Sequence, residues 1–169
     1  EKVLRHAHDR YTSAHFNLGE VLRAKEEYGR ALIHYQAYIN TGDDPATKKD
    51  AKRAIGKVKA SVWKKRLARL SVDIDPSTQS TIAIDGFVVA ENGGLDEMLL
   101  LDGTYTVRAD AKDHKPAEKS VELDHEDSKS IAFELTKKIF FGTAKVTVDQ
   151  KGATVKFHPE KLDNERRPD

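Results

Sequence analysis

The hydrophobic pattern of this chain changes its period once, near Leu67, and that change limits the folds that the chain can adopt. Before Leu67, Ala, Lys, Arg and Glu dominate and apolar residues recur every three or four positions, which is typical of amphipathic helices. After Leu67, apolar and polar residues alternate in short runs between turn residues, which is typical of strands. The sequence therefore predicts an α + β chain of two modules, an all-α helical part followed by an antiparallel β-sandwich.

Three helices are predicted in the first part. Residues 12–25 carry apolar residues at helical spacing, with Ala14, Leu18, Val21 and Leu22 as the stripe. The second helix is predicted over residues 28–40, before a stop signal at residues 41–43. Asp44-Pro45 joins an N-cap residue to a proline at the first helical position, so it predicts a third helix that continues to Arg66. The expected contact residues of this third helix are Ala51, Ala54, Ile55, Val58 and Val62.

The first two predicted helices resemble a tetratricopeptide (TPR) repeat. The matching residues are Leu18-Gly19 in the first helix, Tyr28 between the helices, and Ala31 and Tyr35 in the second helix. His15, Tyr38 and Pro45 depart from the family pattern, and the last two are typical of a terminal repeat. Because one repeat cannot bury its own face, the third helix is expected to cap it and residues 1–10 to end a preceding repeat. Residues 1–66 are thus expected to form a TPR-like module.

The resemblance also implies a binding surface, because the first helices of such repeats line a concave groove. The partner-binding candidates by family position are Phe16, Asn17, Glu20 and Arg23, with Asn17 able to hold a peptide backbone. The alternative is that these four are ordinary surface residues of a capping repeat, since a groove requires several repeats.

The second part predicts an antiparallel sandwich of short strands. Leu70–Asp75 and Thr81–Ile84 alternate apolar with polar residues, and turn signals follow at Pro76, Asp85-Gly86 and residues 92–94. Further strands are predicted at residues 98–101, 105–109, 117–123 and 130–135.

Residues 67–138 resemble a PEGA domain, a bacterial β-sandwich. The matches are Pro76 after the first strand, Ile84-Asp85-Gly86 at the end of the second, Leu101–Val107, and Asp113-His114-Lys115 before a later strand. Of the motif that gives the family its name, only Pro76 is present. The resemblance implies a bacterial, extracytoplasmic location, in the periplasm or cell envelope.

An internal repeat supports this module and extends it. Leu70–Asp75 aligns with Ala144–Asp149, 74 residues later, and Thr81–Ile84 aligns with Thr154–Phe157, 73 residues later. Residues 139–169 are therefore expected to hold the first hairpin of a second, diverged PEGA-like copy and a charged tail. The exposed edge of that hairpin would allow a homodimer.

Composition excludes several classes of partner and chemistry. The formal net charge is +1, from 29 basic and 28 acidic residues, so the field of a nucleic-acid binder is missing and no nucleic-acid partner is expected. The chain has no cysteine and no stretch apolar enough to span a bilayer. A basic run, residues 48–66, is most simply explained as a solvated helix face, with a phosphate- or lipid-binding stripe as the alternative. The chain starts at Glu1 without Met, and we expect it to be a piece of a longer polypeptide.

No catalytic or metal-binding pattern is found among the polar residues. His6 and His8 are two apart and would point away from each other on a helix. Asp73 and Asp75 are expected to face outward on a strand, and residues 124–127, three of which are acidic, to form a turn. We therefore expect no enzyme activity, no catalytic residue, no metal site and no cofactor.

The leading functional hypothesis is a non-enzymatic cell-envelope scaffold or adaptor that binds another protein or peptide, such as an envelope complex, through the TPR groove and the PEGA-like sandwich. The second hypothesis is a module that binds carbohydrate, namely cell-wall glycan, although most sandwich aromatics lie in strand patterns as core residues. A third is the regulatory portion of a larger envelope enzyme or kinase.

Overall fold

The computed structural model describes residues 14–62 and 66–139, and six single positions beyond them, 146, 147, 149, 151, 152 and 154. Within the described residues three helices precede seven strands, which confirms the α + β class with the helices first. Three helices alone do not constitute a repeat array, so a TPR repeat stays a prediction. The expected preceding repeat at residues 1–10 and most of the hairpin expected within residues 139–169 lie outside the described residues.

The helices begin and end close to the predicted positions. The first covers residues 14–24 of the described part, α2 runs from Tyr28 to Thr41, and α3 runs from Pro45 to Ser61. Asp44 caps α3 as predicted, because its carboxylate accepts from the backbone N–H groups of Ala46 and Thr47 at 3.2 and 2.9 Å. The prediction that α3 continues to Arg66 is wrong, since the backbone turns extended at Val62, where the branched side chain favours that conformation.

The helical core forms where the three helices meet. Ala31 and Tyr35 of α2 are fully buried, and so are Ala51 and Val58 of α3, with Ala54 almost so. Ile55 and Val62 pack against the same cluster. The five predicted contact residues of the third helix are therefore confirmed.

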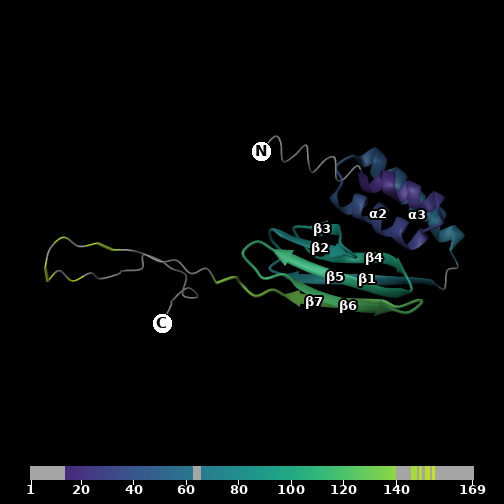
Figure 1. Cartoon of the computed structure of the whole chain (residues 1–169). Helices are drawn as coiled ribbons and strands as arrows, with labels where there is room; N and C mark the ends of the chain where they lie inside the picture. The colour runs from purple at the N-terminus through teal and green to yellow at the C-terminus, as the bar shows by residue number, and fades with distance from the viewer. Residues whose placement is uncertain are drawn as a thin grey trace.

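Seven strands form two sheets (Figure 1). The first sheet has the order β4-β1-β7 and the second has the order β3-β2-β5-β6. The strands are β1 (Leu67–Asp75), β2 (Ser80–Ile84), β3 (Phe87–Glu91), β4 (Leu95–Leu101), β5 (Gly103–Ala111), β6 (Ala117–Leu123) and β7 (Ser128–Glu134).

Two features of the sheets differ from the prediction. β7 pairs in parallel with β1, with Val72 opposite Ile131, so the sandwich is mostly rather than wholly antiparallel. Alternation predicts that a segment is a strand but not its direction, and the turn after β6 carries the chain from one sheet to the other. β3 was not predicted because its residues Phe87–Ala90 are all apolar and do not alternate with polar residues. The structure explains this pattern, since the consecutive residues Val89 and Ala90 are both buried.

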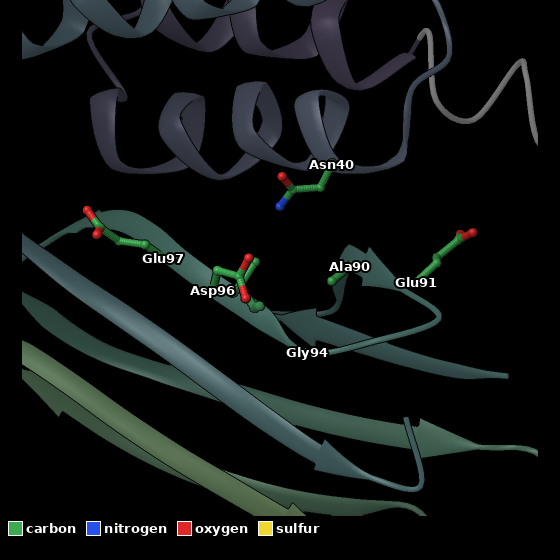
Figure 2. A pocket seen from close by; sticks show the side chains of 7 residues that line it. Asn40, Ala90, Glu91, Gly94, Asp96 and Glu97 are labelled. Atoms are coloured by element: carbon green, nitrogen blue, oxygen red, sulfur yellow. The ribbon is translucent and has the colours of Figure 1, made fainter. Parts of the chain in front are cut away.

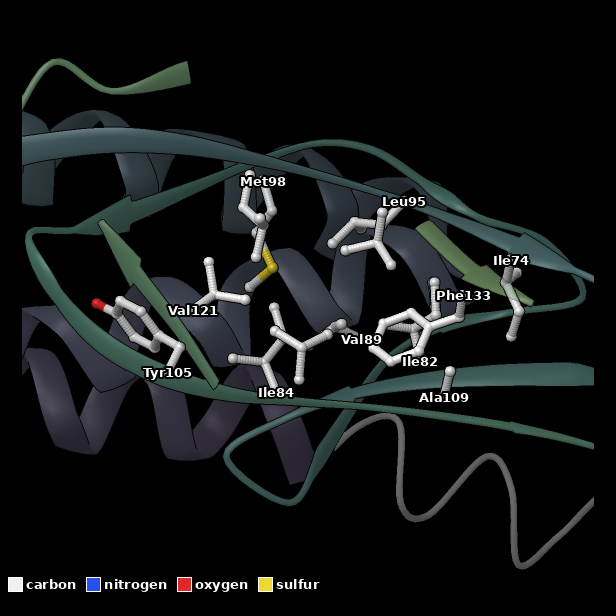
Figure 3. Close-up of a cluster of buried hydrophobic side chains, with 14 of the residues drawn as sticks. Ile74, Ile82, Ile84, Val89, Leu95, Met98, Tyr105, Ala109, Val121 and Phe133 are labelled. Carbon is white, nitrogen blue, oxygen red and sulfur yellow. The ribbon is translucent and has the colours of Figure 1, made fainter. Parts of the chain in front are cut away.

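The sandwich core lies between the sheets and takes side chains from both. Figure 3 shows Ile74 and Phe133 of the first sheet close to Ile82 and Ala109 of the second. Phe133 is 2% exposed and is one of the largest side chains in this core. Burial of such apolar side chains is the main favourable term in folding, at about 25 cal/mol per Å².

α2 contributes to both cores. Its residues Ala31, Leu32 and Tyr35 belong to the helical core, whereas Ile33 and Ala37 belong to the sandwich core. The helix lies against β3 and β4, which are edge strands of different sheets (Figure 1). The helical part is therefore packed directly on the sandwich through α2.

Candidate functional site

The first helix holds the four residues that sequence analysis selected as a groove. Phe16 is half-buried, and its ring centroid lies 6.1 Å from that of Tyr35 and 6.0 Å from that of Tyr38. Gly19 allows this helix to approach α2 closely, since a Cβ there would lie 2.7 Å from the Tyr35 ring. Phe16 thus packs into the helical core.

Glu20 and Arg23 form a polar cluster with Tyr35. The Tyr35 hydroxyl donates to Glu20 Oε1 at 2.7 Å, and Arg23 Nη2 donates to Glu20 Oε2 at 2.8 Å. The Arg23 hydrogen bond lowers the pKa of Glu20, and burial followed by the bond to Glu20 raises the pKa of Tyr35. Glu20 therefore stays ionised and holds the helices together, which does not suit a general acid.

A different set of residues on the first helix faces solvent. Asn17 is exposed, Leu18 is 37% exposed and Val21 is 50% exposed. The structure therefore brings Phe16, Glu20 and Arg23 together around Tyr35 and separates Asn17 from them.

The apolar stripe predicted for this helix is partly wrong. Leu22 is buried, but Leu18 and Val21 turn outward and Phe16 and Gly19 take their place against α2. The sequence held a signal for the correct face, because Gly19 lies three residues after Phe16 and therefore on the same side of the helix. A small residue at a helix crossing marks the side of closest approach.

Two histidines link the first helix, α2 and the sandwich. Their Nδ1 atoms, in His15 and His34, are 2.8 Å apart, and the His34 ring packs edge-on against Phe87 of β3 at 4.4 Å between centroids. His34 is 1% exposed, and its Nε2 has no hydrogen-bond partner among the described residues. Burial lowers the pKa of His15, and burial with the nearby charges of His15 and Arg30 lowers that of His34 to about 4. Both rings are therefore neutral at pH 7.

Two amide side chains of α2 hydrogen-bond to the edge strands below. Gln36 donates to the carbonyl of Leu99 at 2.6 Å and accepts from the N–H of Leu99 at 2.7 Å, so its amide replaces a neighbouring strand for β4. Asn40 donates to the carbonyl of Val89 on β3 at 3.0 Å. Sequence analysis missed both residues, because nothing in the pattern shows that α2 lies over the edge strands.

A shallow depression lies where the end of α2 meets the turn between β3 and β4. Figure 2 shows Asn40 above this site, with Glu91 on one side and Asp96 and Glu97 on the other. Its volume of about 240 Å³ is below the range of roughly 300–1,000 Å³ that is usual for small-molecule sites. Glu97 is also paired with Arg69 at 2.7 Å. The depression therefore offers no enclosed, apolar site for a ligand.

The remaining acidic residues and histidines can be compared with the patterns considered in the sequence. No group of three or more His, Asp or Glu side chains within the described residues could hold a metal ion. Asp73 and Asp75 are exposed, as predicted, and in the turn at residues 124–127 the first three residues are exposed and Asp127 is half-buried. In the part of the chain that the structure describes, no helix combines the length and the hydropathy needed to cross a bilayer.

The basic face of α3 is the most strongly charged surface of the helical part. α3 carries six basic residues against one acidic residue, Asp50. Its buried residues Ala51, Ala54 and Val58 face α2, so the charged side chains lie on the side away from α2.

In comparisons with known proteins, the chain has no significant match to any family model or to any curated protein.

Proposed function

We propose that this chain is a non-enzymatic interaction module of the bacterial cell envelope, in which the helical part binds another protein or peptide and the sandwich acts as its rigid base. The observation that carries the proposal is the exposed apolar pair Leu18 and Val21 beside Asn17. Exposed apolar side chains next to a polar amide suit a polypeptide partner, because apolar burial and backbone hydrogen bonding can occur together.

The rigid base is supported by the packing of α2. Because α2 shares residues with both cores, a partner bound to the first helix would be held in a fixed orientation relative to the sandwich. The TPR and PEGA resemblances and the envelope location remain part of this proposal. In this proposal Asn17 contacts the partner directly. The other three candidates hold the first helix in place against α2, and these are Phe16, Glu20 and Arg23.

The carbohydrate alternative is less well supported by the described residues. A sugar platform requires exposed aromatic rings, but Tyr105 is 8% exposed, Phe133 is 2% exposed and Phe87 packs against His34. Tyr105 also donates its hydroxyl to the carbonyl of Leu101 at 2.9 Å. The other sandwich-region candidates, Phe140, Phe141 and Phe157, lie outside the described residues.

The test is a selection of random dodecapeptides on the chain, followed by affinity measurements with a Leu18→Lys/Val21→Lys variant. We expect selected peptides to bind the variant at least tenfold more weakly, since the variant replaces the apolar pair by two charges. An Ile139→Lys variant is the matched control, because Ile139 is also apolar and 74% exposed, and it should bind normally. Selected peptides that bind all three proteins equally, or binding of cell-wall glycan fragments without any peptide binding, would contradict the proposal.

A further inference from the structure

Charge is distributed unevenly between the helical and strand parts of the molecule. Residues 67–139 contain fifteen acidic and eight basic residues, which gives −7, whereas the helical residues 14–62 contain nine basic and six acidic residues, which gives +3. The basic residues are concentrated on α3, which has six of them against one acid. The near-zero net charge of the whole chain hides this separation. The field around the molecule therefore directs an anionic partner to α3 and away from the sandwich.

The outward face of α3 has two small residues along its centre and cationic side chains around them. Lys49, Gly56 and Ala60 lie opposite the buried residues, and Lys52 and Arg53 lie on either side of the central line that these three form at 3.6 residues per turn. All five are exposed. Arg53 is paired with Asp50 at 3.1 Å, whereas Lys49 and Lys52 form no ion pair with any described residue. Lys49 and Lys52 are thus available to a partner on the same face as the small residues Gly56 and Ala60.

Gly56 is unexplained by the fold. A Cβ at this position would meet nothing within 4 Å, so packing does not require a glycine. Glycine in the interior of a helix costs about 1 kcal/mol relative to alanine. A residue that weakens the helix without a steric reason, at the centre of a charged face, suits the close approach of another backbone.

We propose that the outward face of α3 binds an acidic, extended polypeptide segment that lies along the helix over Gly56 and Ala60, with its carboxylates between Lys49, Lys52 and Arg53. The 17 residues of α3 give a surface of about 25 Å, which is the length of roughly seven or eight extended residues. This inference rests on the proposed function, that the chain binds other proteins, and it names a second surface and the chemistry of its partner.

A membrane surface fits α3 less well than an acidic polypeptide. Helices that lie on membranes bury an apolar face in the bilayer, but the apolar residues Ala51, Ala54 and Val58 of α3 are already buried against α2. The centre of the outward face carries a lysine and small residues and no large apolar side chain.

The experiment measures fluorescence anisotropy of a labelled dodecapeptide of Glu and Gly with the full chain, at low and at physiological salt. We expect binding that weakens with salt and falls at least tenfold in Lys49→Glu/Lys52→Glu. The matched control is Lys112→Glu/Lys115→Glu on the sandwich, which makes the same change in charge at exposed positions and should alter affinity less than twofold. Gly56→Leu fills the central line without changing charge and should also weaken binding at least tenfold. If the double Glu variant is not folded by circular dichroism, Lys49→Ala/Lys52→Ala replaces it.

Equal losses in the two charge-reversal variants, or full binding by Gly56→Leu, would overturn the proposal. So would tighter binding of vesicles of anionic phosphatidylglycerol, through the same lysines, than of the peptide. If the unmodified chain does not bind the acidic peptide but does bind the selected dodecapeptides at Leu18 and Val21, this inference alone is overturned and the proposed function stands.

Discussion

The two open sides of the sandwich are closed by different means. On the side of β3 and β4, the edge strands lie under α2, which buries Ile33 and Ala37 and offers Gln36 and Asn40 to the strand backbones. On the side of β6 and β7, two lysines bridge the edges: Lys119 donates to the carbonyl of Ala132 and Lys129 to that of Glu122.

The difference between the two sides has a thermodynamic consequence. The helix removes apolar surface from water and satisfies backbone groups in a half-buried setting, so it adds stability and joins the helical part to the sandwich. The lysine bridges remain exposed and add little stability, but they occupy backbone acceptors that another strand could pair with. We therefore expect the α2 side to contribute mainly to the stability of the fold, and the lysine side to reduce strand pairing between molecules.

The largest expected effect comes from truncating the helix-covered side. Ile33→Ala should lower the free energy of unfolding by about 2–5 kcal/mol, because Ile33 is 2% exposed and its removal leaves a cavity in the sandwich core. Urea unfolding followed by circular dichroism measures this loss. Ile55→Ala on α3 is the control; since Ile55 is half-buried, the loss should be smaller. A cost below about 1 kcal/mol for Ile33→Ala would mean that α2 is not part of the sandwich core.

The histidine junction on the same side should make stability depend on pH. Because the pKa of His34 is lowered from 6.5 to about 4 in the folded state, the unfolded chain binds more protons between these values. Its contribution is therefore complete above pH 6.5 and is lost as the pH falls toward about 4, with a size on the order of 3 kcal/mol. His15 acts in the same direction. Unfolding free energies measured across this window should fall less steeply in His34→Phe than in the wild type, and parallel curves would contradict this assignment.

The smallest effect on stability is expected on the lysine side. Lys119→Ala/Lys129→Ala should change the free energy of unfolding by less than about 1 kcal/mol, because both side chains are exposed. The same variant should associate more strongly with itself, which analytical ultracentrifugation over a range of concentrations would detect. Lys112→Ala/Lys115→Ala serves as the control with the same loss of charge. Equal behaviour of the two variants would show that the lysines do not protect the edges.

The pattern of the sequence predicts local structure well and the joining of the two parts poorly. The cap at Asp44, the contact residues of α3 and the alternation of β1 follow from short-range chemistry. The contact between α2 and the edge strands depends on residues 63 positions apart, such as Gln36 and Leu99. A polar residue on a helix is normally read as solvent-facing, so no local rule selects Gln36.

The candidate site was predicted only in part for the same reason. The four groove residues were chosen by family position, but their directions depend on the side from which α2 approaches. The closeness of Gly19 to Tyr35 sets that side. Phe16, Glu20 and Arg23 are therefore turned toward α2, and Leu18 and Val21, which were predicted as part of the buried stripe, face solvent.

The central claim is that α2 makes the helical part and the sandwich one cooperative unit, and native-state hydrogen exchange in Gln36→Leu tests it most directly. The substitution leaves the N–H and carbonyl of Leu99 without their partner and should cost about 1–3 kcal/mol. Slowly exchanging amides of α3, such as that of Val58, and of β5, such as that of Val107, should lose the same protection free energy, because both report one global unfolding event. A loss confined to β5, or α3 amides that exchange in the wild type by a separate and lower-energy opening, would contradict the claim.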